Sequence, residues 1–172
     1  GASNAINMLG GFNGSEVGMG IVYMATLGLF ALLTQNNIAI LFLVVTASLA
    51  AFIFFNWYPA KILPGDSLTY LLGALVVSGV IVGNMEKLGL LLLFPFIVEF
   101  FLKLRSKFKA SCLGKIRIDG KLDPPYGKKL YSLTHLFMIL KPMTEKQVTL
   151  SLILLQAVVS IIAFFLIYFR YV

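Results

Sequence analysis

Long apolar segments dominate this sequence and constrain its fold more than any other feature. Five segments approach the length and composition of membrane-spanning helices: Val17–Thr34, Ile38–Phe55, Ser67–Asn84, Leu88–Leu102 and Val148–Phe169. A helix that crosses the hydrocarbon core needs roughly 20 mostly apolar residues. The fourth segment is short and contains Pro95 and Glu99, which predicts a kink or a join to a helical extension. The sequence therefore predicts an all-α, polytopic membrane protein with about five transmembrane helices.

The composition excludes the common alternatives. Of the 172 residues, 59% are hydrophobic and only 12% are charged, whereas soluble domains have roughly half and a quarter. A soluble chain of this length could not bury so much apolar surface. A single cysteine, Cys112, excludes an internal disulfide, and a single histidine, His135, excludes a multi-histidine metal site. We therefore treat residues 1–172 as one integral-membrane domain.

The net charge of +7 is explained by membrane topology rather than by nucleic acid. Loops 1–16, 56–66 and 103–147 are predicted on one side of the membrane, and they carry twelve of the fourteen Lys and Arg residues. The other side carries only Lys87 and Arg170. The positive-inside rule therefore places the N-terminus and the three loops in the cytoplasm and the C-terminus outside.

Several other residues receive simple structural interpretations. Ser15 or Glu16 can begin the first apolar helix. Residues Ser132–Leu140 predict a short apolar helix at the membrane surface, and His135 on it is more simply a packed residue than a catalyst. Cys112 is predicted to be inert. A carboxylate in an apolar segment is expensive, so Glu99 is predicted to face protein or water, and its role stays open.

The first polar cluster, residues 4–14, holds three asparagines and three glycines beside a membrane helix. Asn4 and Asn7 are three residues apart and share one face of a helical turn. Amide oxygens can ligate a hard cation, and amide nitrogens can donate to phosphate. Glycines let the backbone approach a ligand closely. The alternative is a polar helix end followed by a turn.

The second polar cluster, residues 56–67, places Asp66 at the start of a membrane helix. Helix N-termini attract phosphate, and a carboxylate there favours a bridging Mg²⁺. The alternative is that Asp66 is an N-cap and that Trp57 and Tyr58 anchor the loop in the interface.

The third cluster is the basic loop 103–121. Its charge fits the cytoplasmic topology and attraction to anionic lipid. The alternative is a clamp for phosphate or a sugar nucleotide.

Together, these clusters resemble the polyprenyl-phosphate N-acetylhexosamine-1-phosphate transferases, most closely the archaeal and eukaryotic dolichyl-phosphate N-acetylglucosamine-1-phosphate transferases. The matching stretches are Asn4-Ala5-Ile6-Asn7-Met8-Leu9 with Gly11-Phe12-Asn13-Gly14, Asn56-Trp57-Tyr58-Pro59 with Gly65-Asp66, and Thr144–Leu150 with Leu154-Leu155-Gln156. That family has about ten transmembrane helices. The resemblance therefore implies that this chain is the C-terminal half, and that the family's paired aspartates and a substrate-binding lysine lie in the missing N-terminal half.

The resemblance implies a Mg²⁺-dependent transfer at the cytoplasmic face. The phosphate of a membrane polyprenol, such as dolichyl phosphate, attacks the β-phosphorus of UDP-N-acetylglucosamine and UMP leaves, as the first step of lipid-linked glycan assembly. By position, Asn7 and Asp66 match metal-side catalytic residues. The expected substrate-binding residues are Asn4, Gly11, Asn13 and Leu63, with Lys115 and Arg117 as nearby candidates. The membrane is the plasma membrane in an archaeon and the endoplasmic reticulum in a eukaryote.

Three departures from the family pattern stand out. Gly10 replaces an Ala or Asp, and Ser15 replaces a usual Leu. The Arg-His-Arg run of eukaryotic relatives and the His-rich run of bacterial relatives are missing, and Ala110-Ser111-Cys112 lies nearby instead. The residues that recognise the N-acetyl group therefore cannot be carried over.

Other interpretations remain open at this stage. The chain could belong to a bacterial-type undecaprenyl-phosphate transferase, to half of a transporter, or to a non-catalytic membrane scaffold. The expected partners are the two substrates, membrane lipid and the missing half, and a homodimer is also compatible with this interpretation. The 172-residue chain alone is predicted to be inactive, because one aspartate and two asparagines cannot complete the metal and phosphate site.

Overall fold

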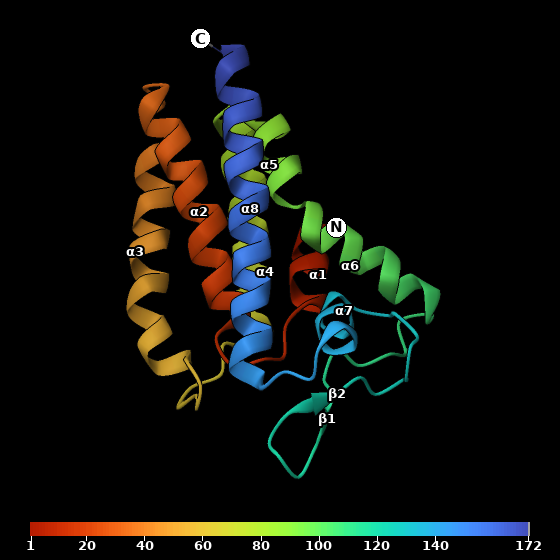
Figure 1. Ribbon diagram of the computed structural model, residues 1–172. Helices are drawn as coiled ribbons and strands as arrows, with labels where there is room; N and C mark the ends of the chain where they lie inside the picture. Colours follow the sequence, from red (N-terminus) through yellow and green to blue (C-terminus); the bar gives the residue numbers. More distant parts are fainter. Residues whose placement is uncertain (172) are drawn as a thin grey trace.

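The computed structural model describes residues 1–171, and four long helices run side by side through it (Figure 1). They are α2 (Ser15–Leu33), α3 (Ala39–Asn56), α4 (Gly65–Val82) and α8 (Glu145–Tyr171). Each is long and apolar enough to cross a membrane. The predicted all-α, multi-pass architecture is confirmed.

The fourth apolar segment is broken into two helices. α5 (Glu86–Leu92) is followed by Leu93, and α6 (Phe94–Arg105) begins with Pro95 in its first turn. Proline has no backbone N–H and cannot continue the hydrogen-bond ladder of the preceding helix. α6 therefore slopes away from the bundle (Figure 1). The predicted kink is confirmed, but neither piece is long enough to span a membrane. Within residues 1–171, four helices rather than five therefore meet that length.

Residues 1–16 are not a simple loop, which corrects the expectation for this segment. Ala2–Met8 form helix α1, which packs along α4. Ser3 lies against Gly73 in the middle of α4, so the start of the described chain lies beside that helix and not in a loop beyond the bundle. Ile6 is 1% exposed, and this burial explains why so short a segment forms a helix here.

The other two segments predicted as loops also contain residues of helices or strands. Strands β1 (Lys115–Ile116) and β2 (Leu122–Asp123) pair antiparallel within the 103–147 segment, followed by helix α7 (Leu133–Leu140). α7 is the short apolar helix predicted over 132–140, and the Ser132 hydroxyl caps it by accepting from Thr134 N. At the other boundary, the 56–66 segment starts with Asn56, which is the last residue of α3.

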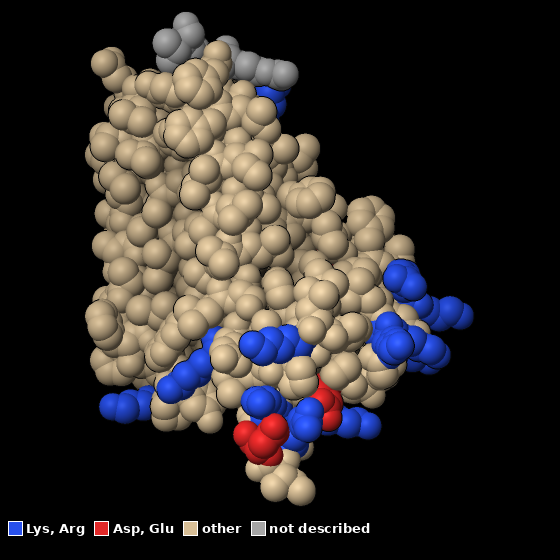
Figure 2. Space-filling model, in the orientation of Figure 1, with Lys and Arg blue, Asp and Glu red and all other residues tan. Residues whose placement is uncertain are grey.

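The two ends of the bundle differ strongly in charge. Lys and Arg side chains gather at the end that carries the β1–β2 hairpin and α7 (Figure 2). The tight turns after α2 and α4 lie at the opposite end (Figure 1). This is the separation of long basic loops from short turns that the sequence predicts. The side chain of Arg170 lies outside the described residues.

α2 is the central helix, and α3 and α8 pack on it. Met24 and Leu27 of α2 have no exposed surface, whereas Ile40 and Phe54 of α3 are 72% and 81% exposed. Rows of exposed apolar side chains are expected where lipid, rather than water, covers the protein. The outer helices therefore present a lipid-facing surface.

The close approach of α1 and α4 gives the first prediction. A Cβ at Gly73 would lie 2.3 Å from the Ser3 Cα, so Gly73→Val should force the helices apart. We expect the free energy of unfolding, measured by denaturation in detergent, to fall by about 1–3 kcal/mol. Ala74→Val, at the exposed next position, is the control and should change it little. Equal effects of both substitutions would contradict the close packing.

Candidate functional site

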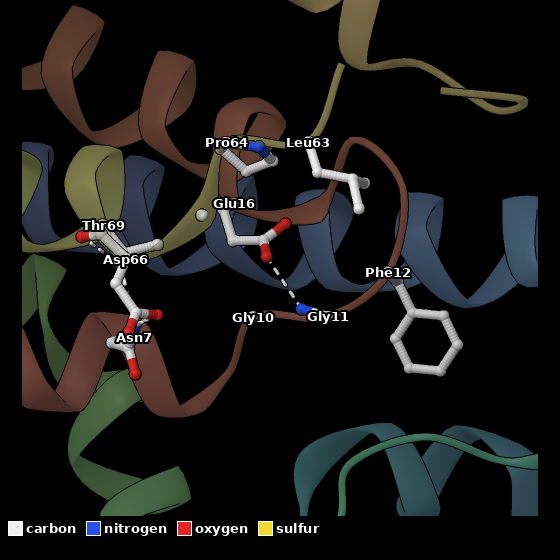
Figure 3. Close-up of a pocket in the computed structure, with 10 residues that line it drawn as sticks. Asn7, Gly10, Gly11, Phe12, Glu16, Leu63, Pro64, Asp66 and Thr69 are labelled. Atoms are coloured by element: carbon white, nitrogen blue, oxygen red, sulfur yellow. Dashed lines mark hydrogen bonds between the residues drawn. The ribbon is translucent and has the colours of Figure 1, made fainter. Parts of the chain in front are cut away.

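A pocket of about 270 Å³ lies where α1 ends and α2 and α4 begin (Figure 3). It is lined by Asn7, Gly10, Gly11, Phe12, Glu16, Leu63, Pro64, Gly65, Asp66 and Thr69. The first and second polar clusters of the sequence therefore meet in space, at the basic end of the bundle. The pocket is small, so it would hold part of a nucleotide-sized ligand rather than the whole.

Asn7 joins the two sides of this pocket. Its Nδ2 donates to Asp66 Oδ1 at 2.7 Å and to Thr69 Oγ1 at 2.9 Å. Thr69 Oγ1 in turn donates to the Asp66 carbonyl oxygen at 3.1 Å. Both amide protons of Asn7 are used in these bonds, so its side-chain oxygen is the atom left to contact a ligand. In the same way, the second carboxylate oxygen of Asp66 is left to contact a ligand.

Glu16 supplies a second carboxylate from the start of α2. Its Oε1 accepts from Gly11 N at 2.7 Å, and its Oε2 lies 2.8 Å from the Ser15 hydroxyl. A Cβ at Gly10 would lie 2.5 Å from Glu16 Oε1. Gly10 and Ser15, two departures from the family pattern, are therefore both residues that contact the Glu16 carboxylate.

Asn56 fixes the two loops that border the pocket. Its side chain is fully buried, and its Oδ1 accepts from Gly14 N at 3.1 Å while its Nδ2 donates to Ile62 O at 3.0 Å. Gly14 has a φ of +80°, and a Cβ there would lie 2.8 Å from the Trp57 ring. Only glycine satisfies both conditions at this turn.

The structure brings together four of the predicted site residues. Asn7, Gly11, Leu63 and Asp66 all line the pocket. The alternative role of Asp66 as an N-cap is not seen, because Pro64 occupies that position and Asp66 lies in the first turn of α4.

The other predicted site residues lie elsewhere in the described chain. Asn4 is exposed on α1, and Asn13 is held by its backbone, whose N–H donates to Glu145 at 2.9 Å. Lys115 is exposed on β1. Arg117 lies 3.5 Å from both Asp119 and Asp123 within the hairpin. The local pairing of the hairpin explains why these two cations do not line the pocket.

Sequence reasoning missed Glu16 and Thr69 as pocket residues. Thr69 follows Asp66 by three positions, so the two share a helix face, and this spacing could have identified it. Glu16 was interpreted only as a helix start. Its turn back onto Gly11 depends on the positive φ angles of Gly11 and Gly14, which spacing does not reveal.

The electrostatics of the pocket favour a cation. Two carboxylates, Asp66 and Glu16, line it, and none of its lining residues is Lys or Arg. Within the described residues there is no group of three or more His, Cys, Asp or Glu side chains that could hold a metal by themselves. The donors present are hard oxygens from one or two carboxylates and an amide. This set fits Mg²⁺, which takes few protein ligands and completes its shell with water and phosphate.

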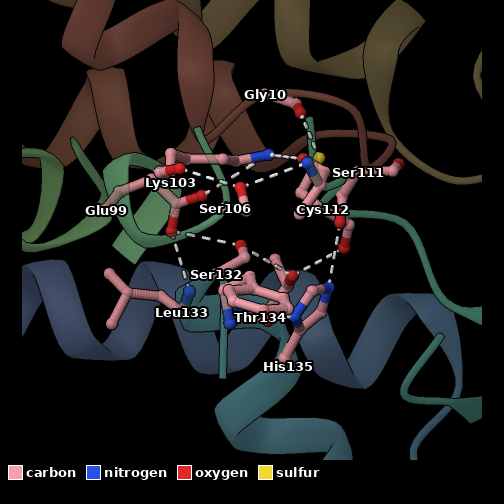
Figure 4. A network of polar contacts seen from close by, with 12 residues as sticks. Gly10, Glu99, Lys103, Ser106, Ser111, Cys112, Ser132, Leu133, Thr134 and His135 are labelled. Atoms are coloured by element: carbon pink, nitrogen blue, oxygen red, sulfur yellow. Dashed lines mark hydrogen bonds and ion pairs between the residues drawn. The ribbon is translucent and has the colours of Figure 1, made fainter. Parts of the chain in front are cut away.

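A buried polar network supports the Gly10–Gly11 side of the pocket (Figure 4). The Cys112 thiol donates to Gly10 O at 2.9 Å, and Thr134 Oγ1 donates to Cys112 O. Burial raises the pKa of the Cys112 thiol, in keeping with an inert residue.

The same network contains Glu99 and Lys103. Glu99 is fully buried and its Oε2 accepts from Leu133 N at 2.8 Å and from the Ser132 hydroxyl at 3.1 Å. Lys103 lies 3.9 Å from the other Glu99 oxygen and donates to Ala110 O at 2.8 Å. Glu99 therefore faces protein, as expected, and ties α6 to α7 and to the segment that covers Gly10.

Known proteins are similar to this chain in the region that forms the pocket. The model of the family described as glycosyl transferase family 4 matches residues 1–84, and this range contains every residue that lines the pocket. Residues 1–84 are therefore similar to the glycosyl transferase family 4.

Individual relatives extend the similarity beyond that domain. A candidate UDP-N-acetylglucosamine–dolichyl-phosphate N-acetylglucosaminephosphotransferase of Saccharolobus solfataricus is 40% identical over 164 residues, covering 94% of this chain and 50% of the relative. The protein of that name in Dictyostelium discoideum is 28% identical over 194 residues, covering 94% of this chain and 47% of the relative. The phospho-N-acetylmuramoyl-pentapeptide-transferase of Campylobacter jejuni is 29% identical over 114 residues, covering 57% and 32%.

These relatives confirm the expected resemblance to the archaeal and eukaryotic branch, and the bacterial type is more distant. This chain spans about half the length of the relatives from Saccharolobus solfataricus and Dictyostelium discoideum. Together with the four long apolar helices, the family supports a multi-pass membrane protein.

The role of Asn56 gives the second prediction. Asn56→Ala should release both loops that border the pocket and lower the free energy of unfolding by about 1–3 kcal/mol. Hydrogen exchange measured by mass spectrometry should speed up in segments 9–14 and 57–64. Asn36→Ala is the matched control, because Asn36 donates to Gly83 O at the opposite end. If the control speeds exchange in the same two segments, Asn56 is not their specific link.

His135 gives the third prediction. Burial lowers its pKa. Its Nε2 donates to Ser111 O at 3.0 Å and its Nδ1 accepts from Tyr131 N, a pairing that requires the neutral ring. Below pH 6.5 the unfolded chain takes up a proton that the folded chain resists, so stability should fall as the pH drops, by at most about 1.4 kcal/mol per pH unit.

This pH dependence is measured as the free energy of unfolding between pH 7.5 and 5.5. The His135→Gln variant should start less stable and show a flatter pH profile. Identical slopes in the two proteins would contradict the assignment.

Proposed function

We propose that the Asn7–Asp66 pocket is part of the active site of an N-acetylglucosamine-1-phosphate transferase. The donor is UDP-N-acetylglucosamine and the acceptor is a polyprenyl phosphate of the dolichyl type. The observation that supports this most is the direct contact between Asn7 and Asp66, the two residues for which the family resemblance implies a metal-side role. The names of the relatives supply the substrate classes.

The pocket's charge supports a requirement for Mg²⁺. A diphosphate would be repelled by Asp66 and Glu16 unless a cation stood between them and the phosphate oxygens. Asp66 and the side-chain oxygen of Asn7 would hold the ion. When bound, Mg²⁺ would neutralise charge on the diphosphate during phosphoryl transfer.

The protein's own residues would position the substrates. A phosphate oxygen of the lipid forms a bond to the β-phosphorus of the donor, the bond from that phosphorus to the bridging oxygen breaks, and UMP leaves with that oxygen. Thr69 and Asn7 hold the Asp66 carboxylate in one orientation before the substrates arrive. Fixed dipoles of this kind stabilise developing charge without reorganisation.

The location of the pocket suits a lipid acceptor. It lies at the basic end of the bundle, beside the first turns of α2 and α4. By the positive-inside rule this end faces the cytoplasm. The membrane would be the plasma membrane of an archaeon, because the relative from Saccharolobus solfataricus described above is 40% identical to this chain and the one from Dictyostelium discoideum only 28%.

The rest of the site would come from the half of the relatives' length that this chain does not cover. The pocket offers one aspartate, one glutamate and one amide, and none of these carries a positive charge that could bind the donor's phosphates. We infer that a lysine and further carboxylates from the missing half complete the pocket, and that the chain alone does not turn over.

Substitution of the pocket residues gives the fourth prediction. In the full-length protein, Asp66→Asn and Asn7→Ala should each reduce Mg²⁺-dependent UMP release by about 10²-fold or more, the range for loss of a group that stabilises the transition state. The matched control is Glu86→Gln, a first-turn carboxylate of α5 at the opposite end, which should keep wild-type rates. Wild-type UMP release from both pocket variants would exclude the pocket from the active site.

A further inference from the structure

A second cavity, of about 510 Å³, lies at the C-terminal end of α6 and shares no lining residue with the Asn7–Asp66 pocket. Its walls come from the turn after α6 and from the loop that precedes α7. The lining residues are Arg105, Ser106, Lys107, Lys109, Ala110, Tyr126, Lys129 and Tyr131. The proposed transferase activity does not account for this cavity.

The cavity concentrates positive charge. Four of its eight lining residues are cations, and none is acidic. Among the described residues, the salt bridges involve Lys103, Arg117 and Lys121, so none of these four cations is paired with a carboxylate. Unpaired like charges held at one site repel each other, and a bound anion relieves that repulsion.

Specific side-chain contacts hold the walls of the cavity in place. Tyr126 and Tyr131 pack edge to face at 5.5 Å, and the Tyr126 hydroxyl accepts from Ser111 N at 3.0 Å. Lys107 and Phe108 follow one another with φ of +53° and +61°. Two consecutive non-glycine residues in the left-handed region are uncommon, and such strain often marks a functional site. Here it turns the chain so that Lys107 and Lys109 face one cavity.

The surroundings of the cavity indicate a membrane interface. Phe101 and Phe108 are 60% and 46% exposed, and both pack on Phe100, at 5.7 and 5.6 Å between ring centres. This exposed aromatic cluster lies on α6 and on the turn that follows it, and adjoins the cations at the end of the helix. Apolar rings beside lysines and arginines are typical of a segment that enters the headgroup region of a bilayer.

We propose that this cavity binds the phosphate of an anionic lipid headgroup. The four cations hold the phosphate, Tyr126 and Tyr131 form the wall, and the Phe100–Phe101–Phe108 cluster lies among the acyl chains. A headgroup, rather than a soluble anion, fits the continuity of the basic cavity with exposed aromatic rings. The inference stands independently of the proposed transferase activity.

The test uses native mass spectrometry of the full chain, titrated with phosphatidylglycerol or with phosphatidylcholine of the same acyl chains. We expect about one phosphatidylglycerol to be retained per chain and phosphatidylcholine to be lost. The double substitution Lys107→Gln with Lys129→Gln should weaken phosphatidylglycerol binding about 30-fold, from a factor of about five for each cation. The matched control is Lys128→Gln with Lys141→Gln, which removes the same charge from exposed positions outside the cavity.

Each outcome either supports or overturns the proposed lipid-headgroup site. Loss of phosphatidylglycerol in the cavity variant, with the control within about twofold of wild type, supports the site. Equal losses in both variants would show only general attraction of a basic surface and would overturn it. A third arm adds inorganic phosphate without lipid: saturation at similar concentrations would assign the cavity to a soluble anion and overturn the lipid headgroup. Circular dichroism of all variants checks that the fold is retained.

Discussion

The hydrogen bond from Asn7 to Asp66 joins two helix ends that are 59 residues apart in the chain. Because α1 and α4 pack closely at Gly73, the end of α1 is held beside the first turn of α4. The amide uses both of its protons on Asp66 and Thr69, so the side-chain oxygen of Asn7 and the second carboxylate oxygen of Asp66 are left for contact with a ligand. The candidate site therefore depends on a helix contact inside the membrane domain as much as on its polar residues.

Two further sets of contacts shape the loops around this pair. The buried Asn56 side chain links Gly14 to Ile62 and thereby joins the loops before α2 and α4. The network of Glu99, Lys103, Cys112 and Thr134 connects α6 and α7 to Gly10 (Figure 4). Buried polar groups in such a network rigidify a site only when they are satisfied, and most of these are. The bend at Pro95 contributes too, because it directs α6 toward the loop end, where Glu99 can reach Leu133.

Much of this arrangement could be predicted from the sequence, because helices that cross a bilayer need long apolar segments, and these are visible in the sequence. The four spanning helices and the kink at Pro95 follow from hydrophobicity and from proline chemistry. Asn7 and Asp66 were predicted through the family resemblance, and the structure brings them together. The α1 helix was missed, because seven residues carry too little local signal and its stability comes from Ile6 packing in the core. Lys115 and Arg117 do not line the pocket, since their positions depend on how the β1–β2 hairpin folds. The position of Glu16 depends on the positive φ angles of Gly11 and Gly14.

The proposed active site requires that Asp66 and Asn7 together hold a divalent ion. The most direct measurement is anomalous X-ray diffraction from crystals of the full-length protein soaked with Mn²⁺ and the sugar nucleotide. We expect a single strong peak within coordination distance of the Asp66 carboxylate and the Asn7 side-chain oxygen, and loss of that peak in Asp66→Asn. A peak elsewhere, with no ion beside Asp66 and Asn7, would contradict this assignment.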